Sequence, residues 1–561
     1  MENNVCMPEP ASVSDRAQPW LFGPLPDLLI GCGLLYALAL PVFFVHGGAI
    51  RARQADALIP VLVLLVSLPH YGATLLRVYE EKEDRRRYRR HAVYSSLLLL
   101  AAFVVALHAP LVATGLVTLY LTWSPWHYAA QNFGLASMFL RRRGAVVGPA
   151  LGRCLRFSFV FSYVLVFLWM HTGEGTPADY AIPFGGDSAR FVGLGIPHRV
   201  SLPLGALALA GYLATLGATL VLILRATTLR AAGPTLSLLL TQVLWFSLPI
   251  TLPLLGFASG LDPLEWSHRD YYFRWIAVGH ASQYLWITAY YARRTSSWSG
   301  YGIYVAKAAM AGTAVWVFPV VLFAPEALGT FSFDAGLAML VGSAANIHHF
   351  ILDGVIWKLR SRPVARVLLE AQQPEAAPRR TFAAHPWLRR FAWSTLAALL
   401  AIRVFWLWEL HFAYPAAMAR KDFDGASAIW NRLAWFGYDD SMRRLDLGWV
   451  LYPHDPERAL TQFERAVALH PSAKGWGSIA LVSANRADWR AALAAYEAGL
   501  AIAPEDPDLL AGAGLAALQL GDPARALPLL ERAKLLRPQD EATQRRLTRA
   551  QREAAKPAVS Y

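Results

Sequence analysis

Long apolar stretches alternate with short polar segments along most of the chain, and each stretch is close to the length that crosses a bilayer. About 20 apolar residues in an α-helix span the roughly 30 Å of membrane hydrocarbon. We therefore predict an all-α, polytopic membrane domain of about eleven spans within residues 22–415. The predicted spans are 22–46, 57–78, 92–113, 115–140, 155–172, 202–224, 234–258, 273–292, 303–324, 334–357 and 392–414.

Basic residues between the apolar stretches predict the orientation of the spans, because short cytoplasmic loops are enriched in lysine and arginine. The segments EEKEDRRRYRR, RRRG, RATTLR, YYARR and KLRSRPVAR all follow even-numbered spans, whereas the alternate loops hold few bases. This asymmetry places segment 1–21 in the cytoplasm and everything after Tyr414 outside, as in a bacterial inner-membrane protein. The net charge of +13 follows from the same bias and requires no nucleic-acid partner.

Several classes of protein are disfavoured by what the sequence lacks. The three cysteines, Cys6, Cys32 and Cys154, have no paired spacing, which argues against a disulfide framework, a cysteine-based zinc site and an iron–sulfur cluster. No P-loop, Rossmann fingerprint or nucleophile elbow stands out, so ATP-driven transport and hydrolysis gain no support. The first twenty residues lack a basic start followed by an apolar run, and we expect no cleavable signal peptide.

After the last predicted span the composition changes to soluble, amphipathic helix. Three segments align there, ERALTQFERAVALHP, RAALAAYEAGLAIAP and ARALPLLERAKLLRP, and their closing prolines Pro471, Pro504 and Pro538 lie 33 and 34 residues apart. This period, with small residues at helix crossings, resembles the tetratricopeptide repeat. The resemblance covers residues 416–561 and implies a helical solenoid that binds a protein or peptide partner. A structural lid or an oligomerisation module is the alternative.

Histidines inside the predicted spans are the strongest functional signal, because ionisable side chains are expensive at lipid depth and therefore usually functional. Counted at 1.5 Å per residue from the basic residues after each span, the rings lie roughly 10 to 20 Å from the cytoplasmic boundary. The four spans concerned all run in the same direction, so their histidines fall in one slab. We predict a single intramembrane metal site with the ligands His70, His127, His280, His348 and His349.

Polar neighbours accompany these histidines. Position i+4 lies on the same helix face as position i, and metal-bound imidazoles generally donate their second N–H to such groups. The predicted supporting residues are Thr74, Gln131, Asn132, Gln283, Tyr284, Asn346 and Asp353. Asp353 also offers a carboxylate ligand. Arg403, deep in the last span, is expected to pair with Asp353 or an anionic lipid head group, or to snorkel to the interface.

Several histidines with one carboxylate and no cysteine suit non-haem iron, zinc or copper. We favour iron, because oxidation of apolar chains is a recurring reason to build such a site in a membrane. The arrangement resembles in outline the Brp/Blh-type membrane carotenoid oxygenases, whose iron is held by histidines from several transmembrane helices, and less closely the membrane desaturases and hydroxylases. The resemblance implies an oxygenase that acts on a lipid or isoprenoid. It transfers no residue assignments, because the spacings differ.

Other functions stay open on the sequence alone. A proton or ion pathway, a plain polar network and a haem site also fit buried histidines. Membrane glycosyltransferases that use polyprenyl-phosphate sugars share the layout of many spans and an outward repeat tail, but they need outer acidic residues. The first outer loop offers only Asp56, and a later outer segment offers Asp262, Glu265, His268 and Asp270. A non-enzymatic, membrane-anchored scaffold is the third class.

Overall fold

The structure, a computed structural model, describes residues 19–39, 57–80, 82–173, 191–247, 266–294, 298–329, 331–369 and 386–555. Its regular elements in these ranges are helices, with one isolated bridge between Thr172 and Ile196, which confirms the all-α prediction for the described residues. The chain divides into two compact units. Unit 1 holds the described residues up to Pro319 together with Met339–Phe412, and unit 2 holds Val320–Ala338 and the residues from Ala413 onwards.

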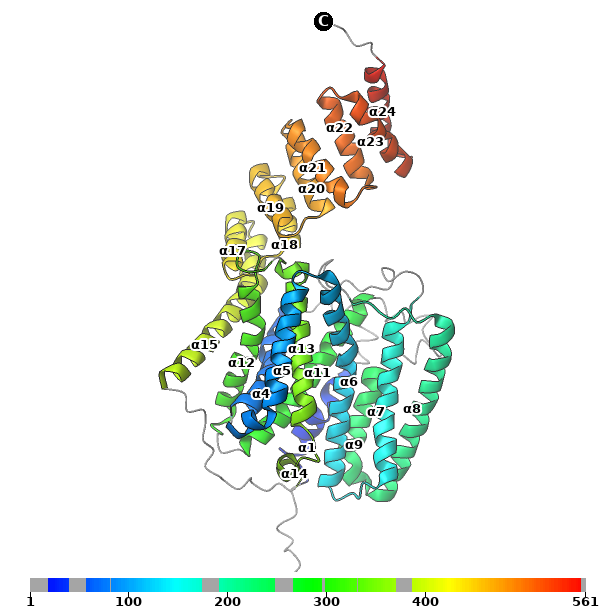
Figure 1. The fold of residues 1–561 in the computed structure, drawn as a ribbon, viewed down its shortest axis with the longest axis vertical. Coiled ribbons are helices and arrows are strands. Elements are labelled where there is room, and N and C mark those ends of the chain that lie inside the picture. Colours follow the sequence, from blue (N-terminus) through cyan, green and yellow to red (C-terminus); the bar gives the residue numbers. More distant parts are fainter. Residues whose placement is uncertain are drawn as a thin grey trace, which may run out of the picture. The chain divides into compact units, whose positions relative to one another are not determined.

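Unit 1 is a bundle of long helices (Figure 1). Elements labelled η are π-helices. The elements are α1 (Pro24–Pro26), η2 (Asp27–Gly31), α3 (Leu58–Leu62), η3 (Val63–Ser67), α4 (Leu68–Tyr79), α5 (Lys82–Ala106), α6 (Pro110–Arg142), α7 (Pro149–His171), α8 (His198–Ala226), α9 (Leu229–Gln242), η4 (Val243–Ser247), α11 (Trp266–Arg293), α12 (Tyr301–Leu322), α13 (Ala338–Ile356), α14 (Arg362–Leu368), α15 (Pro386–Trp408) and η6 (Glu409–Ala413).

Seven helices of the described residues are long and apolar enough to cross a membrane. They are Leu58–Tyr79, Glu83–Ala106, Pro149–His171, His198–Ala226, Tyr301–Leu322, Ala338–Ile356 and Pro386–Ala419. Each overlaps one of the predicted spans, but the count of about eleven is not confirmed. Residues 40–46 and 248–258 of two further predicted spans lie outside the described residues.

The remaining two predicted spans fall in α6 and α11, which are continuous helices of low hydropathy. Both helices carry polar residues in the interior. Asn132 in α6 and Gln283 in α11 are fully buried, and His127 and His280 are buried as well. The prediction also misplaced one boundary, since α5 ends at Ala106 and α6 begins at Pro110 rather than near residue 115. Proline lacks an N–H and therefore favours the first position of a helix.

Helices α4 and α12 approach each other through glycine. A Cβ added to Gly72 would lie 1.8 Å from the carbonyl oxygen of Ala308, and one added to Gly312 would lie 1.7 Å from that of Leu68. No other residue fits either position without moving a helix, and small residues at a crossing are a common way for membrane helices to pack. This contact fixes the position of α4 two residues beyond His70.

Unit 2 contains a run of shorter helices in which each helix from α18 to α24 packs on the next (Figure 1). Pro471, Pro504 and Pro538 each lie two residues beyond the end of a helix, so the repeat in the sequence coincides with a repeat of helix pairs. Assignment to the tetratricopeptide family stays a prediction. The elements are η5 (Phe333–Leu337), α16 (Tyr414–Ala419), α17 (Phe423–Trp435), α18 (Ser441–Leu451), α19 (Pro456–Leu469), α20 (Ala473–Asn485), α21 (Trp489–Ile502), α22 (Pro507–Gln519), α23 (Pro523–Leu536) and α24 (Glu541–Ala554).

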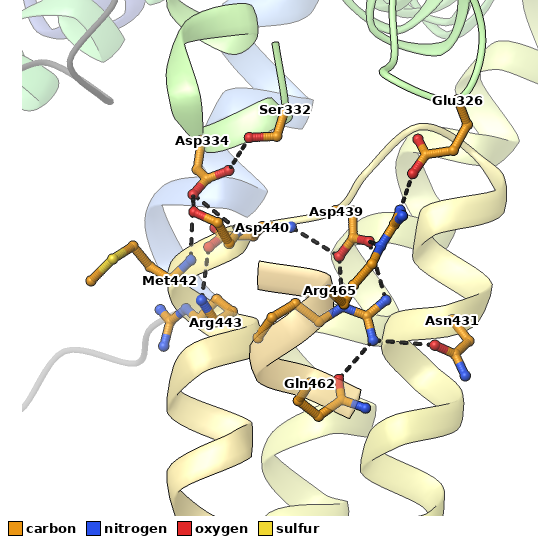
Figure 2. A network of polar contacts seen from close by, with 12 residues as sticks. Glu326, Ser332, Asp334, Asn431, Asp439, Asp440, Met442, Arg443, Gln462 and Arg465 are labelled. Carbon is orange, nitrogen blue, oxygen red and sulfur yellow. Dashed lines mark hydrogen bonds and ion pairs between the residues drawn. The ribbon is translucent and has the colours of Figure 1, made fainter. Parts of the chain in front are cut away.

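Acidic side chains tie segment Val320–Ala338 to the first helices of unit 2 (Figure 2). One carboxylate oxygen of Asp334 accepts hydrogen bonds from the Ser441 N–H at 3.0 Å and the Ser441 hydroxyl at 2.5 Å. Asp440 caps the same end of α18 by accepting from the Arg443 N–H at 2.9 Å. Two carboxylates therefore share one helix N-terminus, where the helix dipole favours negative charge.

A buried ion-pair network lies next to this cap (Figure 2). Asp439 accepts from Arg444 at 2.8 and 3.2 Å and from Arg465 Nε at 2.8 Å. Arg465 also pairs with Glu326 of the 320–338 segment. Arg444 and Asp439 are each 2% exposed, so this pair is held almost entirely out of solvent.

Candidate metal centre

Four histidines from four helices meet inside unit 1: His70 of α4, His127 of α6, His280 of α11 and His349 of α13. None is more than 8% exposed, and one ligand nitrogen of each lies within 4.8 Å of the others. The His70 ring centroid is 5.0 Å from His280 and 4.2 Å from His349, and the His127 centroid is 4.9 Å from each of the same two. Each ring thus neighbours two others, and the group can bind a metal ion.

Most ring nitrogens of these four histidines have no hydrogen-bond partner among the described residues. Nε2 of all four histidines and Nδ1 of His280 make no hydrogen bond within the described part of the chain. A buried polar atom left unpaired costs about 1–3 kcal/mol, so these atoms favour a ligand that pairs with them. Convergent unpaired nitrogens are the arrangement that a metal ion satisfies. A tetrahedral ion with bonds of about 2.1 Å needs N···N separations of about 3.4 Å, so nitrogens that lie up to 4.8 Å apart must approach one another when an ion binds.

Asp353 lies beside the four histidines. Its Oδ2 is 3.3 Å from His349 Nε2 and 3.7 Å from His127 Nε2. Its Oδ1 accepts a hydrogen bond from the Tyr284 hydroxyl at 2.6 Å, with Thr74 Oγ1 at 3.3 Å. One oxygen is therefore held by hydroxyls while the other faces the imidazoles. A carboxylate in this position offsets part of a cation's charge and is within reach of becoming a further ligand.

With Asp353 ionised, as beside a bound cation, the hydrogen bonds around Thr74 assign the tautomer of His349. The Tyr284 hydroxyl donates its single proton to Asp353, and Thr74 Oγ1 lies 2.6 Å from that same hydroxyl. With Asp353 ionised, Thr74 donates its own proton either to Tyr284 or to Asp353. Thr74 must then accept from His349 Nδ1, which is 2.9 Å away. In that state His349 carries its proton on Nδ1 and leaves the Nε2 lone pair free for a metal ion.

The predicted amide residues form a separate chain of hydrogen bonds. Gln131 Nε2 reaches the His280 carbonyl oxygen at 3.4 Å and Gln283 Oε1 at 3.2 Å. Gln283 donates to Asn132 at 3.2 Å, and Asn132 donates to Gln242 at 2.9 Å. These amides support the backbone of α11 and the packing of α6 rather than an imidazole ring.

Two predicted residues of α13 lie away from the four-histidine group. His348 Nε2 is 2.9 Å from the Ser96 hydroxyl of α5, and the ring is half-buried, so the structure does not bring His348 to the proposed metal. Asn346 accepts a hydrogen bond from the Tyr71 hydroxyl at 2.5 Å, and the Tyr71 ring lies 5.5 Å from that of His349. Asn346 therefore supports the centre only through Tyr71.

Other predicted residues lie elsewhere. Arg403 is half-buried on α15. It is not among the described partners of Asp353, which are Thr74, Tyr284, His127 and His349. Asp56, Asp262 and Glu265 lie outside the described residues, as do the side chains of His268 and Asp270. The structure therefore does not test the glycosyltransferase hypothesis, because the acidic side chains that it needs lie outside the described residues.

Trp357 was not among the predicted site residues, although it donates from Nε1 to the Tyr284 hydroxyl at 3.1 Å. Trp357 stands four residues after Asp353, so the same-face rule applied to the histidines would have found it when applied to the aspartate. Gln242, which donates to Ser162 at 2.8 Å, was not predicted either. No sequence signal relates Gln242 to Ser162, because they lie on different helices.

No protein-family model matches the chain, and no curated protein matches it significantly. The four-histidine group therefore has to be interpreted from its own chemistry.

Proposed function

We propose that this protein is an integral membrane metalloprotein that binds non-haem iron through His70, His127, His280 and His349 and oxidises a lipid or isoprenoid with O₂. The observation that carries the proposal is the convergence of four buried imidazoles whose Nε2 atoms make no hydrogen bond within the described part of the chain. An all-imidazole set with one nearby carboxylate also suits zinc or copper. Iron is preferred because the group lies among helices apolar enough to cross a membrane, where apolar chains are the available substrates.

The residues around the four histidines have separate tasks in this proposal. Thr74 holds the His349 ring so that its lone pair faces the ion. Tyr284 holds Asp353 at a fixed orientation, and the Asp353 carboxylate offsets positive charge next to His127 and His349. The buried surroundings keep bulk water away from the reacting carbon.

Iron, when bound, supplies the ability to reduce O₂. Adding both oxygen atoms across a C=C bond gives two carbonyl groups and needs no external electrons. Hydroxylation of a C–H bond places one oxygen in the product and the other in water, and it needs two electrons and two protons from a reductant. Both reactions fit a site for apolar chains, and the product distinguishes them.

The test uses the full-length protein purified in lipid nanodiscs and loaded with Fe²⁺ or with Zn²⁺. We expect O₂ uptake and oxidised lipid products with iron and none with zinc, because zinc has no redox chemistry. The His127→Ala protein should lose O₂ uptake under the same loading. Equal O₂ uptake by the iron-loaded parent and by the His127→Ala protein would contradict the proposal.

A further inference from the structure

A cavity of about 600 Å³ lies directly beside the four-histidine group in unit 1. Its walls come from α6, α7, α11, α13 and the residues that lead into α14. Its volume is typical of sites that bury a small organic molecule. Its walls are largely apolar and rich in aromatic rings, and they include Trp123, Trp126, Phe133, Met138, Ile287 and Phe350.

One end of the cavity is the proposed metal centre. His127, Tyr284 and Asp353 line it, and two of these hold atoms that face the centre. A molecule that fills the cavity therefore lies against the side of the group on which the carboxylate sits. This contact connects the cavity with the chemistry of the histidines.

Three basic residues also line the cavity. Arg156, Lys358 and Arg360 are exposed, whereas His127 and Asp353 are buried, and Asp353 is the single acid among the lining residues. Residues His127 to Met138 of α6 run along the cavity, a distance of roughly 16 Å at 1.5 Å per residue. The cavity thus combines buried polar groups of the proposed centre, largely apolar walls and three exposed positive charges.

Small residues line the cavity where it meets the outside of the bundle. Ala130 of α6 and Gly354 of α13 are both lining residues and both exposed. A Cβ added to Gly354 would meet no atom within 4 Å, and the same holds for Gly134. The small size of these residues leaves room beside the cavity in which an acyl chain would fit.

We propose that this cavity binds a single-chain amphiphile with an anionic head group, carboxylate or phosphate, whose head lies at Arg156, Lys358 and Arg360 and whose chain extends toward His127 and Asp353. The inference rests on the proposed function and specifies its substrate class. A small soluble anion would leave the aromatic walls uncovered, and a neutral hydrocarbon would leave three bases unused. Because the head group is fixed, oxidation should occur at a set distance from it whatever the chain length.

The test measures equilibrium binding of radiolabelled oleate and of oleyl alcohol, which have the same chain, to the full-length protein in zwitterionic nanodiscs. A protein with Arg156, Lys358 and Arg360 all changed to Gln should bind oleate about tenfold or more weaker, because charge-assisted contacts are lost. Its affinity for oleyl alcohol should not change. The matched control changes Arg141, Arg153 and Arg362 to Gln; these three are exposed and do not line the cavity.

A second variant tests the apolar part. Gly354→Leu fills the cavity without a backbone clash and should weaken oleate and oleyl alcohol alike, whereas Gly217→Leu on α8, also in open space, should weaken neither. An alkyl phosphate measured beside oleate shows which head group binds better; selective binding of either supports the proposal. Equal binding of anionic and neutral probes by the parent, or unchanged oleate binding by the triple variant, would overturn it.

Metal content measured on the same samples separates the two proposals. Bound iron with unselective binding of the probes overturns the substrate class alone. Selective oleate binding in a protein that takes up no metal overturns the proposed oxidation alone. The cavity variants should keep the metal content of the parent, because none of them changes a histidine of the group.

Discussion

Replacing Thr74 tests whether hydrogen bonds around the proposed metal site hold its ligands in place. Its hydroxyl is 2.9 Å from His349 Nδ1, 2.6 Å from the Tyr284 hydroxyl and 3.3 Å from Asp353 Oδ1. Thr74→Val keeps the shape of the side chain and removes all three contacts. His349 then loses the acceptor that fixes its tautomer, while Tyr284 keeps its bonds to Asp353 and Trp357.

The expected effect is a 10- to 100-fold loss of metal affinity, the usual result of removing a group that orients a metal ligand. At 1.4 kcal/mol per factor of ten this is about 1.4–2.8 kcal/mol. The same range follows from the contacts, since leaving the buried His349 Nδ1 unpaired costs about 1–3 kcal/mol. The metal site should therefore weaken without disappearing.

The assay is a competition between the purified protein and a chromogenic chelator for Fe²⁺ or Zn²⁺. Thr219→Val is the matched control, because Thr219 is fully buried on α8 and its hydroxyl has no hydrogen-bond partner among the described residues. We expect the control to bind metal as the parent does. An equal affinity for Thr74→Val and Thr219→Val would refute the assignment of Thr74 as the group that orients His349.

Three further predictions concern unit 2 and the topology. Asp439→Asn should destabilise unit 2 by about 3–5 kcal/mol in chemical denaturation, because it leaves the buried charge of Arg444 without its carboxylate partner. The control is Asp424→Asn at an exposed position, which should change stability by less than about 1 kcal/mol. Burial first, and the Asp334 carboxylate second, raise the pKa of Asp440 from 3.8 to about 6. The folded state therefore binds this proton more tightly than the unfolded chain, and stability falls as the pH rises from about 4 to about 6. Asp440→Asn keeps the helix cap and should remove this pH dependence when melting temperatures are measured over a series of pH values. Reporter fusions should give a cytoplasmic signal after residue 143 and an outer signal at the C-terminus, and the reverse pair would invert the proposed orientation.

The convergence of histidines from four helices was predictable because two simple constraints act together. Ionisable groups at lipid depth need a partner, and the fixed helical rise converts a count of residues into a depth. Neither constraint reports rotation about the helix axis. His348 and His349 are adjacent and so point about 100° apart. The sequence could not decide between them, whereas the structure places His349 in the group and His348 against Ser96.

Cross-helix partnerships were the other part beyond the reach of the sequence. The i+4 rule placed Thr74 on the interior face of α4 correctly, but its hydroxyl contacts His349 of α13 rather than His70 of its own helix. The basic residues Lys358 and Arg360 were interpreted only as topological signals. Their position in the wall of a cavity depends on how α6 and α13 pack, and that packing leaves no local mark in the sequence.

The error in the predicted helix boundary near residue 110 has a different origin, because the sequence itself contains the signal for the correct boundary. Apolar residues continue across the break between α5 and α6, so hydropathy alone shifts the predicted spans. Pro110, the first residue of α6, is a helix-start signal that outweighs hydropathy at this point.

The most direct test of the account is the metal content of the full-length protein by elemental mass spectrometry. It compares the parent with single alanine variants of the four histidines and with His348→Ala, whose side chain neighbours His349 but lies outside the group. We predict about one ion per chain in the parent and in His348→Ala, and a large loss when His70, His127, His280 or His349 is replaced. A folded parent that holds no metal after exposure to Fe²⁺ and Zn²⁺, or equal metal content in the His348→Ala and His349→Ala proteins, would contradict a four-histidine metal centre.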